Sequence, residues 1–115
     1  SIESMFDYRE VIDELIDRFG DLPKPVENLM NISYIRTLAS KNGIKSIFQR
    51  NSKIVLEYAD TRFLVPELIG QLSGKYDREI EFDLSNKPEI SVAVKGDMLN
   101  RLRELIELID NLGAQ

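Results

Sequence analysis

Three carboxylates that alternate along one short segment are the residues best placed to do chemistry. Glu79, Glu81 and Asp83 are separated by the apolar residues Ile80 and Phe82. Alternate residues of a strand lie on the same face of a sheet, so the three acids are predicted to share a face. Two carboxylates that converge in a pocket can act as a general acid and base. The same alternation is typical of a half-exposed strand without activity, which is the interpretation we favour.

The composition restricts other kinds of catalysis. The 115 residues include no histidine and no cysteine. Histidine is the commonest proton carrier near neutral pH and the commonest metal ligand, while cysteine supplies thiolate nucleophiles, thiolate ligands and disulfides. The six glycines are isolated from one another, so no glycine-rich phosphate loop is predicted. We therefore expect no catalytic residue, no cofactor site and no metal site in this domain.

The charge distribution argues against direct nucleic-acid binding. The net charge is -5, and the lysines and arginines are scattered rather than gathered in the basic stripe that phosphate backbones require. Tyrosines and phenylalanines could stack on bases, but without basic neighbours most are expected in the core. No apolar run approaches the roughly 20 residues of a membrane helix. A cytoplasmic domain belonging to a longer protein is expected.

Four acids near the N-terminus recur at helical spacing and form what we call the acidic ridge: Glu10, Asp13, Glu14 and Asp17. Spacings of three, four and seven residues place them on one helix face. Such like-charge neighbours destabilise a helix slightly, and an acid near the C-terminal end opposes the helix dipole. Arg9 and Arg18 offset this in part. Two interpretations stay open: a solvated surface, or a surface that binds arginines or lysines of a partner.

The ridge requires a helix, and the apolar spacing predicts one from Asp7 to Phe19. Its buried face is expected to consist of Val11, Ile12, Leu15, Ile16 and Phe19. Gly20 is predicted to end this helix in a left-handed conformation. A second helix is predicted from Pro25 to Asn42, with a broad apolar surface formed by Val26, Leu29, Met30, Ile32, Ile35, Leu38 and Ala39. The short connection indicates a helical hairpin.

The remaining sequence alternates between strand and helix patterns. Residues 44–49 and 53–58 are predicted to form a β-hairpin, and residues 79–84 and 90–94 two further strands. Pro66 is expected to open a short helix that Gly74 ends, and Asp97 to cap a closing helix that ends around Gly113. This order predicts a single α+β domain: a helical hairpin followed by ββαββα, with an antiparallel or mixed sheet covered by helices.

The residues from Glu14 to Pro23, ELIDRFGDLP, followed by VENL at 26–29, resemble a known family. They are similar to the opening of the C-terminal domain of bacterial transcription-repair coupling factors. Ile35-Arg36, Leu38-Ala39 and Asn42-Gly43-Ile44 resemble the second helix of that domain and its exit into the first strand. These motifs cover about residues 10 to 47, and the remainder agrees in pattern only.

The resemblance implies a parent protein that acts in transcription-coupled nucleotide excision repair. Such a parent contains a helicase-like double-stranded DNA translocase that uses ATP and magnesium, a module that binds RNA polymerase, and a module that recruits UvrA. The C-terminal domain would carry no catalytic residue, pack against the UvrA-binding module of the same chain, mask it, and restrain the motor. Carried over by residue, Glu14 and Asp17 are the candidates for binding arginines on that module, with Glu10, Asp13, Arg18 and Asp21 around them.

Three alternatives make different demands on the structure. A carboxylate enzyme needs two acids that converge in a pocket, and a nucleic-acid module needs a positively charged face. A free-standing interaction or homodimerisation domain needs a large exposed apolar patch.

Overall fold

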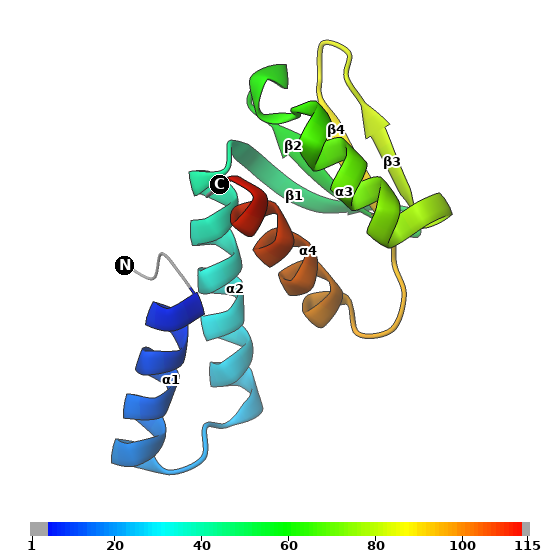
Figure 1. Ribbon diagram of the computed structural model, residues 1–115. Coiled ribbons are helices and arrows are strands. Elements are labelled where there is room, and N and C mark those ends of the chain that lie inside the picture. The colour runs from blue at the N-terminus through cyan, green and yellow to red at the C-terminus, as the bar shows by residue number, and fades with distance from the viewer. Residues whose placement is uncertain (1–4, 114–115) are drawn as a thin grey trace.

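The computed structural model describes residues 5–113, and the side chains of all of these except residues 5, 6 and 19. A helical hairpin leads into a sheet-containing body (Figure 1). The elements are α1 (Met5–Phe19), α2 (Lys24–Lys41), β1 (Ile44–Arg50), β2 (Lys53–Tyr58), α3 (Pro66–Tyr76), β3 (Ile80–Asp83), β4 (Glu89–Ala93) and α4 (Met98–Gly113), with short 3-10 turns at Thr61–Phe63 and Asp77–Glu79. The α+β class and the helical hairpin followed by ββαββα are confirmed.

The sheet is antiparallel throughout, with strand order β1-β2-β4-β3. Strands β1 and β2 are joined by the two-residue turn Asn51-Ser52, in which Asn51 has φ 56°. Asparagine tolerates this left-handed conformation, which suits tight hairpins. The second hairpin inserts β4 beside β2, so the two central strands come from different hairpins (Figure 1).

The helices α2, α3 and α4 contribute to one core on one face of the sheet. Ile54 and Leu56 of β2 and Ile90 of β4 lie in it, together with Leu72 of α3 and Leu105 of α4, and all five are at most 3% exposed. The opposite face has an ion-paired surface, in which Arg50 contacts Glu89 at 2.7 Å and Lys53 contacts Glu81. The alternation of the strands thus separates an apolar face from a charged one.

Helix α1 packs less tightly than its sequence predicts. Of its described side chains only Tyr8 is buried, while Val11, Ile12 and Leu15 are half-buried and Ile16 is 40% exposed. The prediction that this stripe is buried is therefore wrong, because its described members are only half-buried or exposed. The side chain of its last member, residue 19, lies outside those described. The reason is visible in Figure 1, where α1 lies beside the part of α2 that is far from the sheet. Gly20 does end the helix with φ 76°.

Three other predictions need correction. Helix α3 continues past Gly74 to Tyr76, whose ring is buried and extends the apolar face of the helix. Glu79 belongs to a 3-10 turn and lies outside β3. On α2, Val26, Leu29 and Ile32 are 40%, 67% and 41% exposed, so part of the predicted apolar surface stays open to solvent.

Candidate functional site: the acidic surface of the first helix

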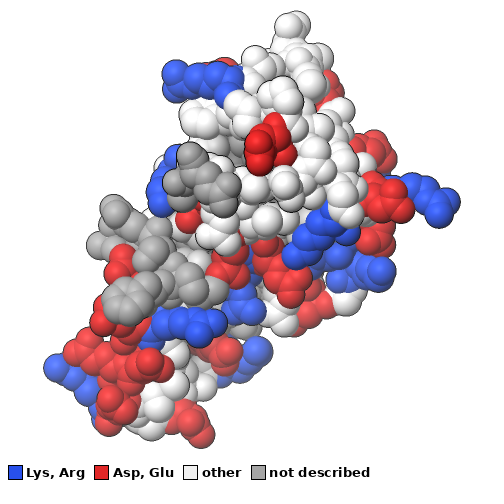
Figure 2. All heavy atoms as spheres, in the orientation of Figure 1, with Lys and Arg blue, Asp and Glu red and all other residues white. Residues whose placement is uncertain are grey.

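All four carboxylates of the acidic ridge are exposed on α1. Successive helix residues are rotated by about 100°, so the four occupy a stripe roughly 100° wide. Figure 2 shows acidic side chains gathered at the lower left, over α1. The helix as a whole carries five acidic residues against two arginines. The excess negative charge is therefore concentrated at one end of the molecule.

The charged neighbours of the ridge divide into two groups. Arg18 pairs with Glu14 at 3.5 Å, and both side chains are 68% exposed, so water weakens this ion pair. Asp21 lies beyond the helix, where it lines a shallow hollow of about 350 Å³ together with Arg9, Asp13 and Glu27. The six predicted site residues are thus all on or next to α1, with Asp21 beside the ridge rather than on it. Such a surface can bind guanidinium or ammonium groups.

A set of polar side chains, three of them buried and two half-buried, holds α1 against the body, and we call it the anchoring cluster: Tyr8, Asn31, Tyr34, Arg103 and Glu107. The rings of Tyr8 and Tyr34 stack with centroids 4.5 Å apart. The Tyr8 hydroxyl donates to Asn31 Oδ1, which also accepts from Arg103 at 3.3 Å. The Tyr34 hydroxyl donates to Glu107 Oε2 at 2.9 Å. The cluster therefore joins α1, α2 and α4.

The electrostatics of the cluster favour neutral tyrosines. Burial raises the pKa of Tyr8, and burial together with the hydrogen bond to Glu107 raises that of Tyr34. Both hydroxyls consequently remain protonated donors at physiological pH. Sequence reasoning missed this cluster. The one local signal was Asn31, a polar residue between Met30 and Ile32 in an apolar stretch of α2.

The acids near the third strand do not form a shared site, because Glu79 lies apart from the other two. Glu79 accepts from Arg101 of α4 at 3.2 Å and pairs with Lys95 at 3.4 Å. Desolvation would raise the pKa of Glu79, but the hydrogen bonds from Arg101 and Lys95 outweigh it and hold the pKa below its ordinary value. Its predicted place on the same strand face as the other two is therefore wrong.

The other two acids have structural partners of their own. Glu81 pairs with Lys53 across the charged face of the sheet. Asp83 accepts from the backbone N–H of Ser85 at 2.9 Å, and hydrogen bonds with Ser85 lower the pKa of Asp83. Within residues 5–113, no group of three or more acids is placed to hold a metal ion. Each of these acids thus has a local structural role.

The sequence model of one family, described as the TRCF domain, matches residues 1–68, which is more than half of the chain. The chain belongs to the TRCF domain family. The match contains α1, α2, the first hairpin and the beginning of α3. The acidic ridge and three members of the anchoring cluster therefore lie inside the part of the TRCF domain that the family model describes.

Three relatives of this TRCF domain carry the name transcription-repair-coupling factor. The protein of Buchnera aphidicola subsp. Acyrthosiphon pisum (strain APS) is 34% identical over 90% of the chain, and that of Bacillus subtilis (strain 168) is 30% identical over 84%. The protein of Escherichia coli (strain K12) is 41% identical over 55% of the chain. The chain spans only 13%, 8% and 6% of the lengths of these three proteins.

A solved structure shares the fold. It is the crystal structure of a C-terminal domain of transcription-repair coupling factor, with a TM-score of 0.76 and 18% identity. The likeness covers 96% of the present chain and 71% of that one.

In the described part of this TRCF domain, no helix is both long and apolar enough to cross a membrane.

Proposed function

We propose that this chain is a non-catalytic regulatory domain of a transcription-repair coupling factor, and that its acidic ridge binds arginines on the UvrA-binding module of the same protein. The contact masks that module and restrains the translocase motor until RNA polymerase is engaged. ATP, magnesium and double-stranded DNA are then bound by other parts of the parent. The domain itself binds none of them, and it works in the cytoplasm.

One observation carries this proposal: four exposed carboxylates share one face of a helix that the anchoring cluster holds in position. Exposed ion pairs contribute only about 0.2 to 1 kcal/mol each, so a contact made of several is specific and still reversible. A mask that must open during each repair event requires such a contact. Like charges on one face destabilise the isolated helix slightly. A cationic partner would neutralise them, which gives a reason for their presence.

The test reverses two charges in the full-length parent. With Glu14→Arg and Asp17→Arg together, attraction to arginines becomes repulsion, which can cost several kcal/mol across an interface. Binding of UvrA is expected to strengthen, and ATP hydrolysis without polymerase is expected to accelerate. Both are measured on the purified parent, by equilibrium binding to UvrA and by the steady-state ATPase rate.

Two controls separate docking from folding. The isolated domain with both substitutions should unfold within about 0.5 kcal/mol of the wild type, because exposed substitutions are usually this mild. Glu104→Arg reverses an exposed carboxylate on α4, near Tyr76, and should leave UvrA binding and ATPase rate unchanged. If the double variant is stable and alters neither activity, the ridge is only a solvated surface.

A further inference from the structure

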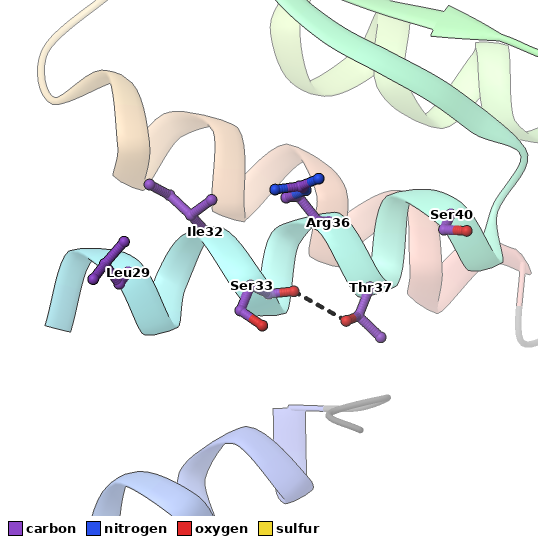
Figure 3. A pocket seen from close by; sticks show the side chains of 6 residues that line it. All are labelled: Leu29, Ile32, Ser33, Arg36, Thr37 and Ser40. Carbon is purple, nitrogen blue, oxygen red and sulfur yellow. Dashed lines mark hydrogen bonds between the residues drawn. The ribbon is translucent and has the colours of Figure 1, made fainter. Parts of the chain in front are cut away.

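A second surface, independent of the ridge, lies along α2 and is left open by every described element. It begins as a hollow of about 510 Å³ lined by α2 alone: Leu29, Ile32, Ser33, Arg36, Thr37 and Ser40 (Figure 3). A second hollow of about 640 Å³ shares Ile32, Arg36 and Ser40 with the first and continues onto β1 and the start of α4. We call the two together the α2 groove.

Helix α2 has apolar residues on more sides than its described neighbours cover. One side meets α1 and α4 through the anchoring cluster, and Ile35, Leu38 and Ala39 are buried toward the body. On the remaining side, Leu29 is 67% exposed and Ile32 is 41% exposed. Large apolar side chains that stay exposed next to one another can mark a surface that binds a partner. Leu29 and Ile32 therefore make this side of α2 a candidate for one more packing contact.

The shape of the groove fits another helix. Leu29 and Ser40 are eleven residues apart on α2, so this side of the helix extends over about 16 Å, or three turns. The small side chains of Ser33, Thr37 and Ser40 allow a second helix to approach α2 closely. Figure 3 shows Ile32 and Arg36 projecting to one border and Ser33 and Thr37 to the other. The Thr37 hydroxyl already donates to the carbonyl of Ser33 at 3.0 Å, so this hydroxyl stays satisfied when a partner covers it.

The charge of the groove identifies the chemistry of its partner. Among the residues that line its two hollows, the charged ones are the cations Arg36 and Lys45, and none is acidic. Neither side chain has an ion pair or hydrogen bond within the described part of the chain, whereas eight other lysines and arginines there are ion-paired. In a protein of net charge -5, a largely apolar groove whose charged lining residues are both unpaired cations is complementary to an acidic partner.

We infer that the α2 groove binds an acidic amphipathic helix from another part of the longer protein that contains this domain. Apolar side chains spaced at i, i+3, i+4 and i+7 on that helix pack against Leu29 and Ile32, and its flanking carboxylates pair with Arg36 and Lys45. The curated relatives are long enough to supply such a segment, because the matching region is at most 13% of their length. This contact goes beyond the proposed function, which uses the opposite sign of charge on a different helix.

Cysteine protection tests the inference directly, because residues 1–115 contain no cysteine of their own. Leu29→Cys is introduced into the parent and into the isolated domain, and the alkylation rate of that residue is followed by mass spectrometry. Labelling is expected to be at least about ten-fold slower in the parent than in the isolated domain. Leu84→Cys, at a residue 52% exposed in the turn between β3 and β4, is the matched control and should react at the same rate in both.

Charge reversal identifies the occupant. In the parent with Leu29→Cys, adding Arg36→Glu and Lys45→Glu should restore the fast rate of the isolated domain, whereas Lys87→Glu, at an exposed residue in the same turn as Leu84, should not. Equal labelling in parent and domain overturns the inference. So does protection that survives the charge reversal, or protection of the isolated domain that grows with concentration, which indicates a second copy. Glu14→Arg with Asp17→Arg should leave protection intact, so the two proposals fail separately.

Discussion

At the scale of single residues, the position of α1 depends on one buried amide. Asn31 is 5% exposed, and its Oδ1 accepts from Tyr8 of α1 and from Arg103 of α4. A buried acceptor shared by two donors couples the elements that supply them, because both donors are positioned by the same oxygen. The ridge carboxylates face solvent and have no comparable constraint, so the cluster, rather than the ridge, sets where the charges lie.

The cluster can be tested by a double-mutant cycle. Tyr8→Phe removes one hydrogen bond and should cost about 1 kcal/mol, with Asn31 still bonded to Arg103. Asn31→Leu should cost about 1–3 kcal/mol, because it leaves the Tyr8 hydroxyl without its acceptor. The double variant should be more stable than the sum of the two losses predicts. Free energies of unfolding in urea measure all three, and strict additivity would mean that the bond contributes nothing.

At the scale of elements, the junction between α2 and β1 is closely packed around Gly43. Gly43 has φ 79°, and its carbonyl accepts from the backbone N–H of Ala59 at 2.8 Å. A Cβ at this position would run into the ring of Phe63. Gly20, at the end of α1, has a similar φ of 76° but open space around it. Comparing substitutions at the two glycines therefore distinguishes the free-energy cost of backbone strain from that of steric overlap.

Alanine substitutions at these glycines should differ in cost. Gly20→Ala is expected to lower the free energy of unfolding by about 1–2 kcal/mol, the cost of a left-handed conformation for a residue with a Cβ. Gly43→Ala carries the same cost and in addition displaces Phe63, and such overpacking adds about 1–3 kcal/mol. Thermal or urea unfolding of both variants gives the comparison. Equal losses would show that Phe63 moves aside freely.

At the scale of the whole molecule, the hairpin of α1 and α2 makes the domain elongated. The extents are 47 × 30 × 23 Å and the radius of gyration is 14.9 Å, whereas a compact chain of this length has a value of about 13 Å. Figure 1 shows the hairpin extending away from the sheet. The acidic ridge is thus carried at one end of the domain, where a partner can reach it without contacting the sheet (Figure 2).

The isolated domain should not retain duplex DNA at physiological salt. Its net charge is -5, and within residues 5–113 eight of its fifteen basic residues are seen in ion pairs. Affinity for a phosphate backbone depends on many basic side chains acting together, and the lysines and arginines are scattered along this sequence. A gel-shift titration is expected to match that of an inert acidic protein. A salt-sensitive shift at micromolar protein would contradict this.

The sequence by itself was sufficient for the elements and for the ridge. Helix and strand periodicities, Gly20, Pro25, Pro66 and Asp97 are local signals, and the observed boundaries agree with them within a few residues. The backbone N–H of Asn100 donates to Asp97 Oδ1 at 3.0 Å, as the predicted cap requires. The spacing of the four ridge acids likewise needs nothing beyond a helix. These features could be predicted because a turn of helix or a strand is determined by residues close in sequence.

Only the tertiary structure decided which elements meet. The strand order placed β4 beside β2, the packing of α4 brought Arg103 to Asn31, and a 3-10 turn directed Glu79 toward Arg101 instead of toward Glu81. The exposed side of α2 could not be predicted either, because apolar spacing indicates which residues can be buried but not whether a partner covers them. Each of these depends on contacts between residues distant in sequence, and periodicity carries no information about such contacts.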